Sequence, residues 1–218
     1  MADVAHVTAG FRDQFYGLRG AVAEAVEGRP RLITSGLIDP LTIRWGETSC
    51  RFDKQTWLEP TVDPTAVDSA IVGWVADRLV PKLMVASQTK VLEVAIDADG
   101  DMVPCTPVVT VEPTGDRPSL AHLAAALTSP LASLLLLHEA AGSALSAQAM
   151  RVSARALGDL PLPPEGPEWD AAAAAVAALD GAPTQPQLVE IGRLAMAAYG
   201  LSERTDIVNW WQSRLRDR

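Results

Sequence analysis

One short acidic segment, residues 97–101, has the composition of a metal-binding loop. Its sequence is Asp-Ala-Asp-Gly-Asp, and alternate carboxylates in such a loop can supply oxygen ligands to a calcium ion. A complete loop of this kind also needs a glutamate at its twelfth position, where this chain has Val108. The segment is therefore interpreted as the solvated turn of a β-hairpin with Asp-Gly chemistry, with calcium binding as the alternative, and no metal site is predicted.

The sequence lacks a recognisable arrangement of catalytic groups. The three histidines, His6, His122 and His138, do not have the spacing of metal ligands. The Gly-x-Ser-x-Gly nucleophile motif is absent, as are the glycine-rich motifs that hold the phosphates of nucleotide cofactors. We therefore predict neither a catalytic residue nor a cofactor, with an unrecognised hydrolase kept as an alternative.

Side chains suited to DNA contact occur near the start of the chain. Residues 10–18 begin with a glycine and have another near their end, so we expect a surface loop that presents Arg12, Gln14 and Tyr16. Arginine can pair bidentately with guanine and glutamine with adenine, while a tyrosine ring can stack on a base or fill the space of a flipped one. Arg12 and Gln14 are thus predicted to read base edges.

A second polar group, Gln88-Thr89-Lys90, interrupts an apolar region rich in β-branched residues. Burying such side chains without partners costs about 1–3 kcal/mol per group, so they must face solvent, a partner or DNA. Basic residues on neighbouring segments could then line one phosphate-binding face with Lys90. They are Arg44, Arg51, Lys54 and Lys82. An ordinary solvated sheet face explains the same pattern and stays open.

Charge and hydropathy limit the class of protein. The chain has 218 residues, of which 48% are hydrophobic and 21% charged, and its formal net charge is −9. Residues 1–90 hold 10 basic and 11 acidic side chains, whereas residues 91–218 hold 8 and 16. The chain is long enough to build its own core, and a locally basic face can still form in its first half despite the overall charge.

We expect a cytoplasmic protein without a membrane segment. The best apolar run, residues 131–137, is far shorter than the roughly 20 residues that a membrane-spanning helix needs. The N-terminus lacks the basic and apolar regions of a secretion signal. Two cysteines, Cys50 and Cys105, form neither a disulfide framework nor a metal cage, and we expect reduced, partly buried thiols.

The elements that must position these side chains indicate an α+β fold, in which a mixed, twisted β-sheet has flanking helices and a helical segment follows. Strands are expected at residues 31–35, 42–46, 49–52 and 82–96, the last returning through the turn at 97–101 along 102–111. Pro104 and Pro107 confine the return strand to a sheet edge or break it. Helices are expected at residues 64–80, 119–128, 131–141, 154–159, 168–180, 186–199 and 203–216, with Asp63 and Ser153 as caps.

A proline-rich segment, residues 160–167, divides the chain. We expect residues 1–164 to form one α/β domain and residues 165–218 a helical tail for docking or oligomerisation. The tail carries Trp210 and Trp211 beside apolar residues, which is typical of an interface anchor. The alternative is that both tryptophans cover the core of the chain itself.

Three passages resemble a known family. They are the opening residues 3–12, the strand region Pro81-Lys82-Leu83-Met84-Val85, and a third passage made of residues 123–130, 142–145 and 157–164. The third is the most specific, with Thr-Ser-Pro at the end of a helix, then Gly-Ser-Ala-Leu, then the exit Leu-Gly-Asp-Leu-Pro-Leu-Pro-Pro. In this order they resemble the target-recognition domains of N6-adenine DNA methyltransferases and of type I restriction specificity subunits, over roughly residues 1–164.

The resemblance implies recognition without chemistry. The family's methylating enzymes carry an Asn/Asp-Pro-Pro-Tyr/Phe motif and a glycine-containing cofactor motif, and neither occurs here. The implied protein is a DNA specificity subunit or domain that works beside a separate SAM-dependent adenine methyltransferase in restriction–modification or phage defence in bacteria. Its partners would be double-stranded DNA, the methyltransferase subunit and, as an option, a second copy of itself. The rival interpretation is an acidic protein–protein adaptor that does not bind DNA.

Overall fold

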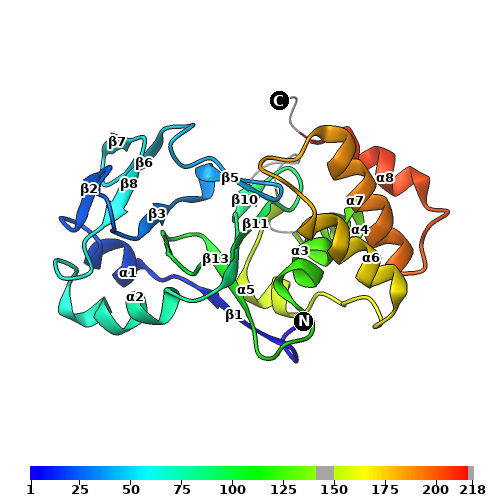
Figure 1. Cartoon of the computed structure of the whole chain (residues 1–218), viewed down its shortest axis with the longest axis horizontal. Helices are drawn as coiled ribbons and strands as arrows, with labels where there is room; N and C mark the ends of the chain where they lie inside the picture. The colour runs from blue at the N-terminus through cyan, green and yellow to red at the C-terminus, as the bar shows by residue number, and fades with distance from the viewer. Residues whose placement is uncertain (141–149, 216–218) are drawn as a thin grey trace.

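Strand β9 (Lys82–Val85) is central to a four-stranded antiparallel sheet with the order β1-β13-β9-β11. The other strands are β1 (Ala5–Ala9), β11 (Val94–Asp97) and β13 (Val109–Pro113). All four residues of β9 are buried, because other elements cover both faces of the sheet. The computed structural model describes residues 1–140 and 150–215, and Figure 1 shows this sheet between a strand-rich part and a helical part.

A second four-stranded sheet, of order β12-β3-β8-β2, builds the strand-rich part. Its strands are β2 (Val22–Glu24), β3 (Arg31–Ile33), β8 (Pro60–Val62) and β12 (Met102–Pro104). Strand β12 pairs parallel to β3 at the edge of the sheet. The edge position accommodates Pro104, which lacks an N–H group for a further ladder, so the expected edge placement of this proline is confirmed.

Three short antiparallel ladders complete the strands. They pair β4 (Ile38–Asp39) with β5 (Thr42–Ile43), β6 (Cys50–Phe52) with β7 (Gln55–Trp57), and β10 (Gln88–Thr89) with β14 (Met150–Arg151). The fold is α+β as expected, but its strands are divided among several small sheets.

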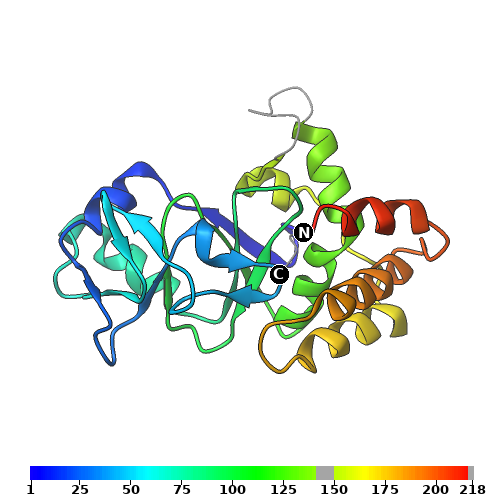
Figure 2. The same ribbon diagram turned by 90° about the horizontal axis from the view of Figure 1, so that it is seen from above.

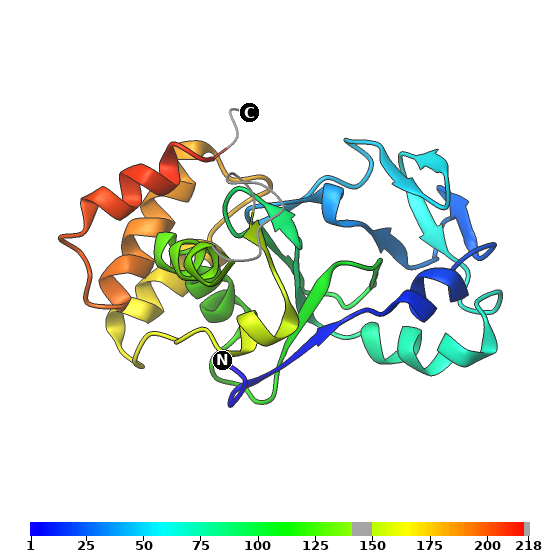
Figure 3. The same ribbon diagram turned by 180° about the vertical axis from the view of Figure 1, so that it is seen from behind.

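Two helices cover the strand-rich part, namely α1 (Arg12–Gly17) and α2 (Val72–Arg78). In the views of Figures 1 and 3 both lie at the end of the molecule opposite the C-terminal helices. The expected helix at 64–80 is shorter because Asp63 accepts hydrogen bonds from the backbone and hydroxyl of Thr65, which hold a turn there. Asp68 instead caps a 3₁₀ turn, η2 (Ser69–Ile71), that leads into α2. A second such turn is η1 (Ser35–Leu37).

The remaining helices occur where the sequence predicts them. They are α3 (Leu120–Thr128), α4 (Pro130–Ala140), α5 (Ala154–Gly158), α6 (Pro167–Ala177), α7 (Gln185–Ala198) and α8 (Thr205–Gln212). Helices α6 and α8 end earlier than expected, and the last residues of two predicted ranges, 141 and 216, lie outside the described residues. Ser153 caps α5 as expected, since its hydroxyl accepts from the backbone N–H of Ala156. Among the described residues no single helix is long and apolar enough to cross a bilayer; α3 and α4 reach that length only as a pair, which is bent by 63°.

The helices beyond residue 164 share a core with the central sheet. Leu83 of β9 and Leu123 of α3 are fully buried in the same cluster as Val176 of α6 and Ile191 of α7. Figure 2 shows α6, α7 and α8 gathered around α3 and α4. The helical segment is therefore packed onto the rest of the chain, and burial of its apolar face contributes to the common core.

The prediction of a hairpin around residues 97–101 is wrong. Strand β11 pairs with β9, so the hairpin forms one step earlier in the chain, and β12 leaves for the second sheet. Asp97 redirects the chain, because its carboxylate accepts hydrogen bonds from the backbone N–H groups of Gly100, Asp101 and Met102. Gly100 is required here, since it has a φ of +69° and a Cβ atom would lie 2.6 Å from the carbonyl carbon of Val80.

Candidate nucleic-acid interface

Helix α1 carries a stack of two guanidinium groups on one tyrosine ring. The guanidinium carbon of Arg12 lies 5.2 Å from the centroid of the Tyr16 ring, and that of Arg19 lies 5.7 Å from it. Arg12 also donates a hydrogen bond of 2.9 Å from Nη2 to the Tyr16 hydroxyl oxygen. The four-residue spacing places Arg12 and Tyr16 on one helix face, and all three side chains are exposed. We call Arg12, Tyr16 and Arg19 the arginine–tyrosine stack.

The segment that bears the stack is a helix, not the expected loop. Gln14 explains the difference, because its Oε1 atom accepts a hydrogen bond from the backbone N–H of Phe11 and so satisfies a donor at the start of the helix. Beneath the helix, Phe15 packs on Phe52 with ring centroids 5.1 Å apart. Gly17 fits closely against the 3₁₀ turn η2, since a Cβ atom there would lie 2.7 Å from the side chain of Ile71. The helix is thus fixed on the strand-rich part.

Gln14 has a structural role in addition to the predicted one. A glutamine that reads adenine needs both its carbonyl oxygen and its amide group at the base edge. Here the carbonyl oxygen accepts one hydrogen bond within the chain, while an amide oxygen can accept two. Gln14 therefore caps the helix, and its reading of bases stays a prediction.

The β6–β7 hairpin adds a positive charge beside the stack. Its turn residue Asp53 forms an ion pair with Arg19, with 2.7 Å between the carboxylate oxygen and Nε. Lys54 is the next residue, is exposed, and has a φ of +65°, while Asp53 has a φ of +45°. Such two-residue turns favour glycine or asparagine because a left-handed backbone strains other side chains. The chain therefore keeps a strained lysine at the tip of this hairpin, and strain of this kind concentrates at functional sites.

Arg44 and Arg51 do not join the arginine–tyrosine stack. Arg44 forms ion pairs with Asp39 (3.3 Å) and Glu47 (3.0 Å), which neutralise its charge. Arg51 is exposed in β6 between the buried residues Cys50 and Phe52. Because side chains alternate along a strand, Arg51 lies on the face of the hairpin opposite to the one that contacts α1.

The prediction that Lys82 binds phosphate is wrong, because this side chain is fully buried. Its ammonium group pairs with the equally buried carboxylate of Asp97 and donates a 3.2 Å hydrogen bond to the carbonyl of Val80. Burial lowers the pKa of Lys82, and the hydrogen bond with Asp97 opposes that shift. The Asp97 carboxylate is therefore bonded within the fold. In the described ranges 1–140 and 150–215, no group of three or more side chains is placed to bind a metal ion.

The group at residues 88–90 alternates in exposure. Gln88 and Lys90 are exposed, whereas Thr89 is buried, so Thr89 cannot contact DNA as predicted. Figure 1 shows β10 beside β11 in the middle of the molecule, away from α1. The predicted phosphate-binding face is thus divided between separate surfaces, with Lys90 on one and Lys54 on the other.

The C-terminal tryptophans have different environments. Trp211 is fully buried with Leu188 and Val208, and a Cβ atom on Gly192 would lie 3.2 Å from its ring. The prediction that Trp211 docks a partner is wrong, since its ring completes the helical core. Trp210 is half-buried and carries the Arg214 guanidinium 5.0 Å from its ring centroid.

A polar array that the sequence did not reveal joins α3 to α6. The Ser119 hydroxyl oxygen lies 2.7 Å from Nδ1 of His122, and Nε2 of His122 lies 2.9 Å from a carboxylate oxygen of Asp170. Arg117 also pairs with Asp170. Hydrogen bonding from His122, followed by that from Arg117, lowers the pKa of Asp170. Ser119 is the N-cap of α3, so the array is interpreted as a link between helices and not as a nucleophile with its base.

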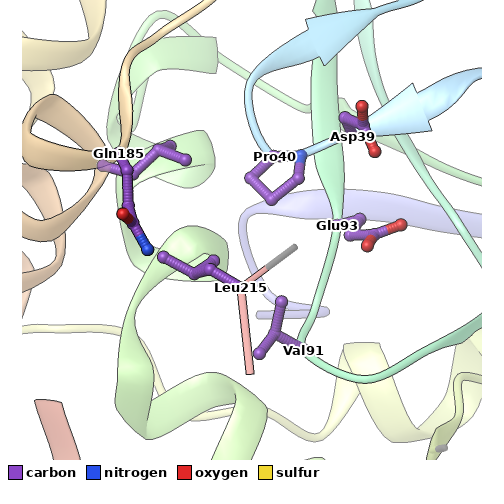
Figure 4. Close-up of a pocket in the computed structure, with 7 residues that line it drawn as sticks. Asp39, Pro40, Val91, Glu93, Gln185 and Leu215 are labelled. Carbon is purple, nitrogen blue, oxygen red and sulfur yellow. The ribbon is translucent and has the colours of Figure 1, made fainter. Parts of the chain in front are cut away.

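The cavities among the described residues differ widely in size, from the space of one water molecule to an open groove of about 490 Å³. The pocket of Figure 4, between the β4–β5 turn and the C-terminal helices, is lined by Pro40, Gln185 and Leu215 among others and has a volume of only about 10 Å³. That is the space of a single water molecule. A wider open groove of about 490 Å³ is lined by Arg29, Arg31 and Trp45. Its arginines are neutralised by ion pairs with Asp63 and Asp101.

Both cysteines are buried and unbridged, as expected for reduced thiols. Burial raises the pKa of Cys105 to about 12, so this thiol is a weak nucleophile.

Two comparisons with known proteins complete the description. No protein-family model matches the chain. No curated protein matches it either.

Proposed function

We propose that this protein is a non-catalytic DNA target-recognition subunit or domain that acts with a separate SAM-dependent N6-adenine methyltransferase. The observation that carries the proposal is the arginine–tyrosine stack, in which the guanidinium carbons of Arg12 and Arg19 lie 5.2 and 5.7 Å from the centroid of the exposed Tyr16 ring. Arginine binds both phosphate and base edges, and an aromatic ring offers a stacking platform for bases. The setting would be bacterial restriction–modification or phage defence in the cytoplasm, as the family resemblance of the sequence implies.

The charge of Arg12 is available to a phosphate. Its hydrogen-bond partner is the uncharged hydroxyl of Tyr16, so the guanidinium keeps its full positive charge. The charge of Arg19 is neutralised by its ion pair with Asp53. Lys54, the next residue in the hairpin turn, adds a positive charge to the same region. The interface is therefore small and only moderately basic, which fits a subunit that needs a partner to bind DNA tightly.

The helices at the far end of the molecule carry only part of the excess negative charge of residues 91–218. Helices α6, α7 and α8 hold four acidic side chains and one basic side chain, and Figures 1 and 2 show them at the opposite end of the molecule from α1. Most of the excess lies in residues 91–140, which hold seven acidic side chains and one basic side chain. Repulsion between carboxylates and DNA phosphates falls off within a Debye length of about 10 Å, so DNA bound at α1 would avoid the acidic side chains of the three helices.

The test is DNA binding by the full chain, alone and after co-expression with the adenine methyltransferase encoded beside it. Fluorescence anisotropy on a pool of random duplexes at two salt concentrations should give salt-sensitive binding, which Arg12→Ala weakens. Arg155→Ala is the matched control, because Arg155 is 91% exposed on the distant helix α5. Absence of binding at low salt, with or without the methyltransferase, would rule the proposal out.

The second candidate is an acidic protein–protein adaptor, favoured by the net charge of −9. An adaptor of this kind engages a basic partner through its acidic second half, residues 91–218, and leaves the stack unused. Salt separates the two candidates, since phosphate neutralisation gives a steep dependence of DNA affinity on salt. A complex with a basic protein that excludes DNA would favour the adaptor.

A further inference from the structure

Phe11 is the most conspicuous apolar side chain on the strand-rich surface, with 70% of its area exposed. A single exposed apolar side chain is ordinary on a protein surface, so the case for a binding role depends on what surrounds the ring. Phe11 is the N-cap residue of α1 and directly precedes Arg12, the first residue of the arginine–tyrosine stack.

The backbone of Phe11 is held rigidly. Its N–H group donates to Gln14, and its carbonyl oxygen accepts a 3.1 Å hydrogen bond from the hydroxyl of Thr106. The preceding Gly10 lies so close to Thr106 that a Cβ atom would come within 2.6 Å of that hydroxyl oxygen. The ring is thus presented on a backbone fixed from both sides, which lowers the entropy lost when it inserts into a partner.

We propose that Phe11 is a wedge that inserts between stacked base pairs of duplex DNA and locally opens them. The inference rests on the DNA-recognition function proposed above and adds a mechanism to it. Apolar wedges next to basic side chains are the means by which several DNA-binding proteins unstack a base step. Here Arg12 and Arg19 supply the positive charge that would anchor the flanking phosphates, while Phe11 occupies the opened step.

The surroundings favour DNA over a protein as the occupant. The core of a protein–protein interface surrounds its aromatic anchors with apolar area, although arginine is also enriched there. Around Phe11 the exposed neighbours in sequence, Arg12 and Asp13, are charged, and the next exposed aromatic residue, Tyr16, has two guanidinium carbons 5.2 and 5.7 Å from its ring centroid. This combination of charge and ring faces complements a stack of bases between two phosphate chains.

A wedge should bind more tightly where the bases are already poorly stacked. The experiment measures the affinity of the full chain for a 30-base-pair duplex of mixed sequence and for the same duplex with one central C·C mismatch, at low salt. The wild-type chain should prefer the mismatched duplex by roughly fivefold or more, because part of the unstacking cost is already met. Phe11→Ala should bind both duplexes equally, and Phe11→Trp should keep the preference.

Leu58→Ala is the matched control. Leu58 is 45% exposed directly after β7, beyond the hairpin that carries Lys54, and its loss removes exposed apolar area without touching α1. The control should keep the preference for the mismatch. Because Phe11 is exposed, its substitution should leave folding intact, which circular dichroism checks.

The outcomes separate the wedge from the function on which it rests. If wild-type protein binds both duplexes with equal affinity, or if Phe11→Ala keeps the preference for the mismatch, the wedge is overturned and DNA recognition survives. If no duplex is bound at low salt, DNA recognition itself fails and the wedge fails with it. A preference that Phe11→Ala and Leu58→Ala lose alike would also overturn the wedge, since it would then reflect general apolar surface.

Discussion

Lys82 and Asp97 form a fully buried ion pair between the neighbouring strands β9 and β11. The two residues lie directly opposite each other in the ladder, so the register of the strands brings their side chains together. The same carboxylate accepts hydrogen bonds from three backbone N–H groups in the turn that leads to β12. One aspartate therefore neutralises a buried charge and connects the two four-stranded sheets.

Lys82→Met should destabilise the protein strongly, because it leaves the Asp97 carboxylate buried without its counter-charge. Breaking a buried pair in this way costs about 3–5 kcal/mol. Adding Asp97→Asn should recover part of the loss, since an amide oxygen can still accept from the backbone N–H groups of the turn. Urea unfolding of the two single variants and the double variant measures the effect. A Lys82→Met protein as stable as the wild type would contradict the prediction.

The sequence predicted the helices well and the sheets poorly, and Asp97 shows the reason. Helices α3 to α8 follow local periodicity and local caps such as Ser153, which neighbouring residues determine. The pairing of β11 with β9, and of β12 with β3, depends on contacts between residues far apart in the chain. The turn at 97–101 has the composition of a hairpin, but the buried ammonium group of Lys82 directs the Asp97 carboxylate to a different use.

The candidate site was only partly predictable for a similar reason. Arg12 and Tyr16 are four residues apart, so their proximity follows once the segment is a helix. Arg19 and Lys54 join them through the Asp53 ion pair, which no local pattern indicates. Lys82 and Trp211 were assigned to the surface because of their residue types, although tertiary packing buries both. Whether the site binds DNA stays a prediction.

Lys54→Gly should raise stability and lower DNA affinity together. Glycine adopts the positive φ of this turn without strain, which stabilises the folded state by roughly 1 kcal/mol. The same substitution removes an exposed charge beside the arginine–tyrosine stack. Thermal unfolding and anisotropy on duplex DNA measure the two effects. A variant that gains stability with unchanged affinity would show that Lys54 does not contact phosphate.

Asp170→Asn should destabilise the protein at neutral pH and make no difference in acid. Hydrogen bonds from His122 and Arg117 hold the pKa of Asp170 below its ordinary value of 3.8. A carboxyl group with a depressed folded pKa contributes stability that is present above its unfolded pKa and is lost as the pH falls through the folded pKa. Chemical unfolding at pH 6 and below pH 3.5 should therefore show a difference between wild type and variant that disappears in acid.

Asp180→Asn is the control for this pH experiment, because Asp180 is exposed just beyond the C-terminal end of α6. Its difference from the wild type should be small and independent of pH. A difference for Asp170→Asn that persists below pH 3.5 would mean that the array joining α3 to α6 does not depend on the charge of this carboxylate.

Tyr16 and Arg12 should make separable contributions to DNA binding. Tyr16→Ala removes a stacking surface, which is worth about 1–3 kcal/mol per base in other proteins, and should lower affinity by roughly tenfold without changing its dependence on salt. Arg12→Ala removes one phosphate contact and should reduce the slope of the logarithm of affinity against that of salt by about 0.9. Tyr16→Phe keeps the ring under both guanidinium groups and should bind nearly as well as the wild type, which shows whether the ring or the hydroxyl matters. If Tyr16→Ala altered the salt slope as much as Arg12→Ala does, the ring would act by positioning the guanidinium groups, and the stacking role would be excluded.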